Sequence, residues 1–99
     1  MTKHNLKLND RYFDAVLNGI KTFEIRKDDR GFRVGDTLEM YRVNDNGLYV
    51  SKDGTYVSNE KGAWLEPIQM KVTYIITHAD FPAGIPEGYV VMSIEKVKE

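Results

Sequence analysis

A stripe of apolar residues near the start of the chain has the spacing of a helix. Its members, at positions i, i+3, i+4 and i+7, are Phe13, Val16, Leu17 and Ile20. This stripe predicts a helix over residues 10–18. Asn9 precedes it and can satisfy a free N–H of the first turn through its side-chain oxygen. Gly19 follows at the place where a left-handed residue commonly ends a helix.

Most other apolar residues alternate with polar ones, which is the period of a β-strand with one buried face. Leu6 and Leu8 predict a short strand before the helix. Residues 34–43 predict another strand. From residue 68 onward, one strand face is predicted to hold Ile68, Met70, Val72, Tyr74 and Ile76. A loop over 78–88 follows, and residues 89–97 are apolar enough to form a last, central strand.

The segment TFEIR, directly after the predicted helix, alternates in the same way. Phe23 and Ile25 are its apolar members, so we expect them to face the core. Thr22, Glu24 and Arg26 then share the opposite face, about 7 Å apart at each step. This strand therefore predicts a polar face at the junction with the helix.

Turn-forming residues separate the later strands. Residues 44–47 contain the Asn-Gly pair typical of tight hairpins, and further turns are predicted at 52–54 and 59–62. Weakly patterned strands over 48–51 and 55–58 fit between them. One N-terminal helix with five to seven short strands predicts a mainly β (α+β) fold. We expect it to close, or nearly close, into a small β-barrel, because closure removes exposed strand edges.

The composition is that of one globular domain covering residues 1–99. The chain is 41% hydrophobic and 29% charged, and it has no cysteine. No apolar run approaches the roughly 20 residues that span a bilayer, and the N-terminus lacks the apolar core of a signal peptide. We therefore expect a cytoplasmic protein with no membrane partner. The sequence leaves the oligomeric state open.

Charge is unevenly spread along the chain. The net charge is −1, which argues against a broad electrostatic grip on a nucleic-acid duplex. Residues 1–33 nevertheless hold eight Lys and Arg against five Asp and Glu, whereas residues 34–99 hold six against ten. This positive excess marks either a binding region or the chance fluctuation of a small protein.

The densest polar cluster lies in residues 19–30, read as GIKTFEIRKDDR. Its candidate ligand-binding side chains are Lys21, Thr22, Glu24, Arg26, Lys27 and Arg30. Arg and Lys can bind a phosphate, and Glu can accept hydrogen bonds from a base edge. Outside the cluster, Tyr41 and Trp64 are candidates for stacking on a base. The alternative interpretation is a solvated strand face with weak surface ion pairs.

Catalytic and metal-binding motifs give little support to other functions. The sequence has no phosphate loop, no Rossmann fingerprint and no recognisable Ser/His/Asp spacing. His4 and His78 lie far apart and have no partner at metal-ligand spacing, so we expect no metal site. His78, beside Asp80, is interpreted as a loop residue rather than a general base. We expect no cofactor.

The run LNGIKTFEIR (residues 17–26), followed by Val34-Gly35-Asp36, resembles the ASCH domain (activating signal cointegrator homology) of the PUA-like superfamily. A closer resemblance is to a compact bacterial and phage branch known only as a domain of unknown function. The segments that match its motifs are His4–Lys7, Tyr12–Lys27, Asp29–Asp36 and Glu87–Met92. The resemblance reaches nearly end to end, with residues 44–67 matching least. It implies a small β-barrel with helices on its side.

PUA-like and ASCH domains are mostly RNA-binding modules, so the resemblance implies a ligand cleft between the helix side and the barrel. A different ASCH branch is an amidohydrolase that removes the acetyl group of N4-acetylcytidine, and its Lys matches Lys21. Glu24 occupies the position of its nucleophilic Thr, and a carboxylate cannot simply replace an activated hydroxyl. Thr22 lies two residues away from that position. The candidates for its late Glu are Glu66, Glu87 and Glu95.

Three function hypotheses follow. The first is a binding module for RNA, a nucleotide or a modified nucleoside, with positive charge from Lys21 and Arg26. Glu24 would then accept hydrogen bonds from base amino groups or hold Arg26 in place. The second is an enzyme acting on a modified nucleoside, with Lys21 as base or charge stabiliser and Glu24 activating water. The third is a protein-interaction domain that uses the charged strand face.

Overall fold

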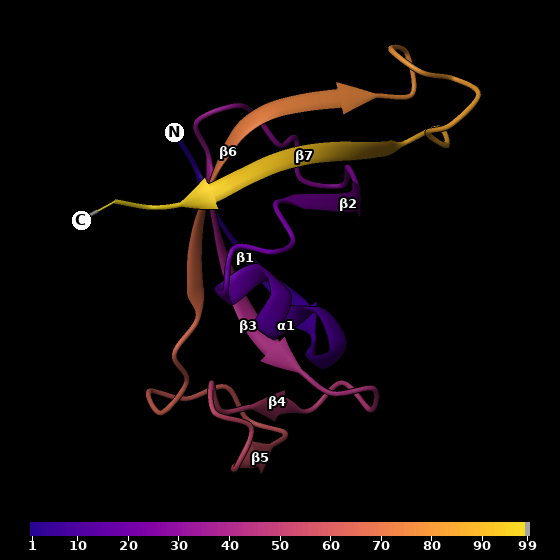
Figure 1. Ribbon diagram of the computed structural model, residues 1–99. Coiled ribbons are helices and arrows are strands. Elements are labelled where there is room, and N and C mark those ends of the chain that lie inside the picture. Colours follow the sequence, from indigo (N-terminus) through magenta and orange to yellow (C-terminus); the bar gives the residue numbers. More distant parts are fainter. Residues whose placement is uncertain (99) are drawn as a thin grey trace.

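The computed structural model describes residues 1–98 and shows a bent β-sheet with one short helix beside it (Figure 1). In chain order the elements are β1 (Lys3–Asn9), α1 (Asp10–Leu17), β2 (Phe23–Lys27), β3 (Thr37–Val43), β4 (Tyr49–Val50), β5 (Val57–Ser58), β6 (Ile68–Thr77) and β7 (Tyr89–Lys96). The predicted mainly β fold with one N-terminal helix is confirmed. Within the described residues, no helix is long and apolar enough to cross a membrane.

Helix α1 begins and ends as its local signals predict. The side-chain oxygen of Asn9 accepts a hydrogen bond from the backbone N–H of Arg11 at 3.0 Å. Gly19 adopts a φ of +73°, and the N–H groups of Gly19 and Ile20 donate to carbonyls of the last helical turn, which makes a Schellman motif. The predicted apolar stripe is wrong at its end. Gly19 ends the helix, and Ile20 beyond it is 79% exposed.

The strands form one sheet in the order β2-β7-β6-β3-β4-β5, and β1 pairs in parallel with the other side of β3. The remaining pairings are antiparallel. Strand β7 lies between β2 and β6, which confirms the prediction of a central last strand. Across residues 1–98 the pairing does not return from β2 to β1. Of the two predicted alternatives, full closure into a barrel is therefore wrong, because no strand pairing closes the sheet within the described residues.

Two arginine side chains span the opening between β2 and β1. Arg26 Nη2 donates to the carbonyl of Lys7 at 2.7 Å, and Arg30 Nη1 donates to the carbonyl of Asn5 at 2.7 Å. Thr2 directly precedes β1, and its carbonyl, which points to the opposite side from those of Asn5 and Lys7, accepts a hydrogen bond from the N–H of Thr37 in β3. The two arginines therefore satisfy two carbonyls on the β1 edge that faces away from β3. Side chains do here what a closing strand would do in a barrel.

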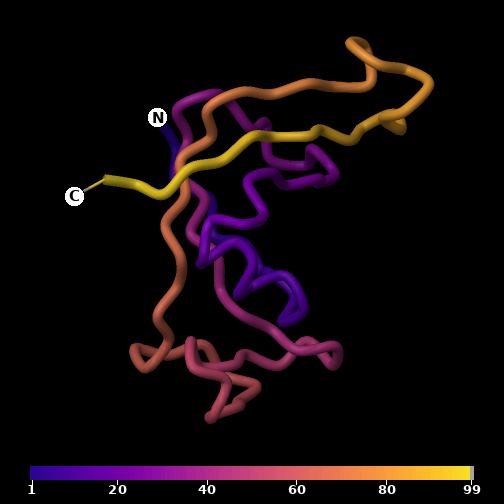
Figure 2. Tube along the Cα trace, viewed as in Figure 1, coloured from indigo at the N-terminus to yellow at the C-terminus, as the bar shows by residue number. Residues whose placement is uncertain are grey.

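Strand β6 changes face halfway along its length. Ile68, Met70 and Val72 are buried as predicted, but the register with β7 shifts between Val72 and Tyr74. Tyr74 is 66% exposed, and Ile75 packs against the core instead. The predicted common face is wrong beyond Val72, because one extra residue in a strand reverses its alternation. Figure 2 shows the chain bending within β6, so that its first half runs beside β3 and its second half beside β7.

Strand β2 turns its polar face inward. Glu24 is 3% exposed, whereas Phe23 is 45% and Ile25 is 57% exposed. The prediction that Phe23 and Ile25 face the core is therefore wrong. Glu24 and Arg26 do share a face, as predicted. The physical reason is that the face with Glu24 and Arg26 lies toward the free edge of β1, where backbone carbonyls need hydrogen-bond donors rather than apolar contacts.

The main apolar core fixes α1 against the sheet. Phe13 and Val16 of the helix pack with Leu38 and Met40 of β3 and with Met92 of β7, and all five side chains are fully buried. Burial of a large apolar side chain contributes about 1.5–3 kcal/mol. This core sets the position of the helix end from which β2 starts.

The segment between β3 and β6 contains the predicted hairpin turns. The side chain of Asn44 accepts from the N–H groups of Asn46 and Leu48, each at 3.0 Å, and Gly47 has a φ of +78°. The turn at residues 52–54 joins β4 to β5. Both of these strands have two residues. They are shorter than predicted, because their weak apolar pattern buries little.

Candidate functional site

Lys21, Glu24 and Arg26 form a charged cluster, which we call the Glu24 clamp. Lys21 Nζ donates to Glu24 Oε1 at 2.7 Å, and Arg26 Nε donates to Glu24 Oε2 at 2.9 Å. Each carboxylate oxygen therefore contacts its own cation. The Schellman motif at Gly19 brings Lys21 to the start of β2, and the period of β2 places the other two members on its inner face.

Glu24 is a buried charge with two compensating partners. Its side chain is 4% exposed, whereas the side chains of Lys21 and Arg26 are 17% and 25% exposed. Burying an unpaired carboxylate costs several kcal/mol of hydration free energy, so the two cations stabilise it. One positive charge remains in excess, on the two side chains that reach the surface. Glu24 thus holds two cations in position, and the clamp presents positive charge outward.

Lys21 is held by aromatic rings and by the backbone as well. Its Nζ lies 5.4 Å from the ring centroid of Tyr12 and 4.8 Å from that of Phe23, within cation–π range. It also donates to the carbonyl of Phe23 at 2.6 Å. An ammonium group has three donors and a guanidinium has five. Lys21 and Arg26 each use two donors in the contacts described, which leaves hydrogen-bonding capacity for a ligand.

The clamp lines a cleft of about 620 Å³, the Glu24 cleft. Residues of β1, α1 and β7 complete its walls around the segment 21–27. Its further aromatic and cationic lining residues are Tyr12, Phe23, Tyr89, Lys7 and Lys27. A volume of roughly 300–1,000 Å³ is typical of small-molecule sites. The Glu24 cleft is therefore large enough for a nucleoside.

A second cleft of about 260 Å³ adjoins the first, and we call it the tyrosine cleft. Lys7 and Arg26 line both clefts. Tyr41 and Tyr49 are its aromatic residues, with ring centroids 6.3 Å apart in an edge-to-face arrangement. The pairing of β3 with β4 brings these two rings together. The two clefts thus form one groove across the β1 edge.

The groove is positively charged, although the chain carries a net charge of −1. Its cationic lining residues are Lys7, Lys21, Arg26, Lys27, Arg30 and Lys61. Glu24 is its acidic lining residue. In the tyrosine cleft, Lys61 Nζ lies 4.1 Å from the Tyr41 ring centroid, and Lys7 Nζ lies 5.6 Å from that of Tyr49. The structure therefore concentrates cations and aromatic rings on one surface.

Six of the eight candidate residues from the sequence line this groove: Lys21, Glu24, Arg26, Lys27, Arg30 and Tyr41. Thr22 does not, since it is exposed, lines neither cleft, and contacts β7 through its carbonyl, which accepts from the N–H of Ile94. Trp64 lies elsewhere, in residues 51–66. The predicted polar face of β2 is thus divided, with Thr22 outside the site.

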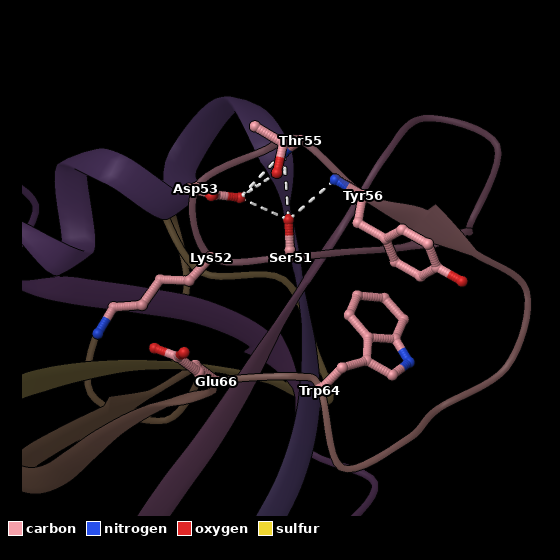
Figure 3. A pocket seen from close by; sticks show the side chains of 7 residues that line it. All are labelled: Ser51, Lys52, Asp53, Thr55, Tyr56, Trp64 and Glu66. Atoms are coloured by element: carbon pink, nitrogen blue, oxygen red, sulfur yellow. Dashed lines mark hydrogen bonds between the residues drawn. The ribbon is translucent and has the colours of Figure 1, made fainter.

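Trp64 lines a third cleft, of about 720 Å³, formed by residues 51–66 (Figure 3). Its ring meets that of Tyr56 edge-to-face, with centroids 4.7 Å apart. Hydrogen bonds from Ser51 and Thr55 lower the pKa of Asp53 to about 2, so this carboxylate is ionised and engaged within its own turn. The third cleft has one lysine against two acidic residues among its lining and lacks the charge of the groove.

A buried hydrogen-bonded pair that the sequence analysis did not predict, His4 and Asp36, ties the N-terminus to the start of β3. His4 Nε2 lies 2.8 Å from Asp36 Oδ2, and the two side chains are 7% and 4% exposed. Burial alone would raise the pKa of Asp36. Hydrogen bonds from His4 and from the N–H groups of Thr2 and Arg33 outweigh it and lower that pKa below 3.8. The Asp of the Val-Gly-Asp turn therefore anchors the fold.

The other histidine, His78, contacts the backbone of the loop between β6 and β7. His78 Nδ1 lies 2.6 Å from the carbonyl of Ile85, within the connection between β6 and β7. Within the described part of the chain, no three His, Asp or Glu side chains are close enough together to hold a metal ion. The polar groups that line the groove are ammonium, guanidinium, carboxylate, phenol and amide groups.

The sequence analysis did not propose six of the charged and aromatic groove residues as site residues: Lys7, Tyr12, Phe23, Tyr49, Lys61 and Tyr89. The alternation of β1 carries a usable signal for Lys7, because it lies on the face opposite to Leu6 and Leu8. No local signal exists for Tyr49 or Lys61. Only the long-range course of β4 and of the segment after β5 brings them beside Tyr41.

Comparison with known proteins places these residues within a family. A family model described as a domain of unknown function (DUF3850) matches residues 3–94. An uncharacterized 12.9 kDa protein in the GpA 3′ region of Escherichia phage P2 is 50% identical over 38 residues. Those residues are 38% of this chain and 35% of the phage protein, so the match spans about a third of that protein.

Proposed function

This chain belongs to the DUF3850 family, and from the geometry of its groove we propose that it binds RNA, a nucleotide or a modified nucleoside in the Glu24 cleft. The observation that carries the proposal is the clamp itself. A buried carboxylate fixes Lys21 and Arg26 at the wall of a nucleoside-sized cleft. Both cations keep donors for a phosphate or for base oxygen and nitrogen acceptors.

The surroundings of the clamp support a nucleotide-type ligand. Tyr12, Phe23 and Tyr89 offer aromatic surface, and every base has a π-face that can stack on it. The resemblance of residues 17–26 and 34–36 to ASCH domains supports the same class of ligand. The net charge of −1 favours a short ligand held locally over a long duplex held by its backbone. The predicted cytoplasmic location is consistent with such a ligand.

Glu24 has a positioning role in this proposal. Of the two roles that the sequence allowed, contact with base amino groups and support of Arg26, the geometry favours the second. Both oxygens already accept from cations at 2.7 and 2.9 Å. Amide hydrolysis of the kind performed by the ASCH amidohydrolases needs a hydroxyl nucleophile. The hydroxyl-bearing residue nearest to the clamp in sequence, Thr22, lines neither cleft. The absence of Thr22 from both clefts argues against the nucleophilic mechanism, and the engagement of both Glu24 oxygens by cations argues against activation of water by Glu24.

The test is a calorimetric titration with short single-stranded RNAs, the four common ribonucleosides, their monophosphates and N4-acetylcytidine, against wild type and the Lys21→Met and Arg26→Met variants. Trp64 lies in the third cleft, so Trp64→Leu serves as the matched control. We expect binding by wild type and control and at least a tenfold loss in both clamp variants, the scale of one charge-assisted contact. No binding of any probe to wild type would refute the proposal. Release of cytidine from N4-acetylcytidine would establish the enzyme instead.

A further inference from the structure

We propose that the tyrosine cleft is a second nucleotide subsite, so that the preferred ligand contains two adjacent nucleotides of a single strand. This inference rests on the proposed function of the Glu24 cleft and names the substrate class more closely. One base occupies the Glu24 cleft, the neighbouring nucleotide lies against Tyr41 and Tyr49, and the phosphate between them contacts Lys7 and Arg26.

The position of the two shared residues supports this assignment. Lys7 and Arg26 line both clefts, and the hydrogen bond from Arg26 Nη2 to the backbone carbonyl of Lys7 fixes the guanidinium at the junction. A group that connects two occupants must pass this junction. In a nucleic-acid strand the connecting group is an anionic phosphate, and two cations at the junction match that charge.

The tyrosine cleft has the chemistry of a single-strand subsite. Its lining contains four cations, which are Lys7, Arg26, Arg30 and Lys61, two tyrosines and no carboxylate. Cationic grooves with interspersed aromatic rings are typical of proteins that bind single strands. Tyr41 and Tyr49 are half-buried and meet edge-to-face at 6.3 Å, so their rings are fixed before a ligand binds. A fixed aromatic surface costs little entropy on binding.

The size of the cleft limits what it can hold. Its volume of about 260 Å³ is below the range of roughly 300–1,000 Å³ for complete small-molecule sites. It therefore accepts part of a ligand whose other part lies in the Glu24 cleft. Lys61 Nζ, 4.1 Å from the Tyr41 ring centroid, belongs to an exposed side chain, and an arriving base can take its place.

Dinucleoside monophosphates test this inference against nucleoside monophosphates. A nucleoside monophosphate carries about two negative charges at pH 7, whereas the phosphodiester of a dinucleoside monophosphate carries one. Attraction to cations alone therefore predicts weaker binding of the dinucleoside. A second subsite predicts the opposite, and we expect the dinucleoside monophosphate to bind about tenfold more tightly, the scale of one base–aromatic contact.

The variants Tyr41→Leu and Tyr49→Leu should remove this tenfold gain and leave the affinity for the monophosphates unchanged. Trp64→Leu, with an aromatic residue lost from the third cleft, should keep the gain. Circular dichroism checks that each variant is folded. Equal affinity of wild type for mono- and dinucleoside probes, or a gain that survives in both tyrosine variants, overturns the second subsite and leaves the proposed function standing. Failure of every probe to bind overturns both proposals.

Discussion

Replacing Glu24 by Gln tests whether the clamp is the buried ion cluster that the structure shows. The substitution keeps the shape of the side chain but removes the charge that holds Lys21 and Arg26. Breaking a fully buried ion pair costs about 3–5 kcal/mol, and breaking an exposed one costs about 0–1 kcal/mol. Glu24 is 4% exposed, but its partners are 17% and 25% exposed and can regain water. We expect an intermediate loss of about 2–3 kcal/mol in the free energy of unfolding.

The assay is thermal and urea unfolding followed by circular dichroism. For a domain of this length the expected loss corresponds to a decrease in Tm of roughly 10–20 °C. Glu39→Gln is the matched control. Its partner Lys3 is 58% exposed and lies 3.9 Å away, so this variant should change stability by less than about 1 kcal/mol. A Glu24→Gln variant as stable as Glu39→Gln would refute the reasoning.

A double-mutant cycle with Lys21→Met separates the ion pair from other effects of the substitution. If the 2.7 Å contact between Lys21 and Glu24 contributes directly, the losses of the two single variants will not add in the double variant. We expect a coupling free energy of about 1–2 kcal/mol, within the range for residues in contact. Strict additivity would mean that Glu24→Gln acts through packing and not through the clamp.

Three further predictions concern the fold. Hydrogen bonds lower the folded-state pKa of Asp36 below 3.8, so the stabilising contribution of this carboxylate is fully present above that value and is lost as pH falls through the lowered pKa. The Asp36→Asn variant should therefore show a flatter dependence of unfolding free energy on pH below about 4, as measured by urea titrations at several pH values. Gly19→Ala should lower the free energy of unfolding by about 1–2 kcal/mol through backbone strain at a φ of +73°, because no atom lies within 4 Å of the added Cβ to clash with it. An unchanged Tm would contradict the left-handed helix end. Ile20→Lys should change stability by less than about 0.5 kcal/mol, and a loss above 2 kcal/mol would mean that Ile20 belongs to the core.

The parts of the fold that sequence predicts well depend on local contacts. The cap at Asn9, the left-handed Gly19 and the hairpin at residues 44–47 each involve hydrogen bonds within a few residues. In each case the residue type strongly favours the conformation that the structure shows. The central position of β7 could also be predicted, because its run of apolar residues favours burial.

The face of β2 could not be derived from its own pattern. Alternation separates Phe23 and Ile25 from Glu24 and Arg26, but it does not say which face lies inward. That choice depends on the free carbonyls of β1, a long-range feature, and on the turn after the helix that brings Lys21 to Glu24. The cost of burying Glu24 is offset only once both cations are in place.

The bend of β6 and the composition of the groove have the same origin. An alternating pattern from Ile68 to Ile76 is compatible with a straight strand, and the register shift near Thr73 follows from pairing with β7. The meeting of Tyr41 with Tyr49 follows from the pairing of β3 with β4. The sequence therefore predicted six of the charged and aromatic groove residues, whereas their arrangement, and the approach of Tyr49 and Lys61 to Tyr41, depend on the sheet.

The arginine contacts at the β1 edge link the proposed ligand binding to self-association of the protein. Arg26 and Arg30 cover the carbonyls of Lys7 and Asn5, which would otherwise form part of an unpaired strand edge. Unpaired edges are templates for pairing with another chain. Neutralising both arginines in order to abolish binding would therefore also uncover a surface for self-association. A variant that tests the proposed binding is therefore best made at Lys21, whose contacts are to Phe23 and Glu24 and not to the β1 edge.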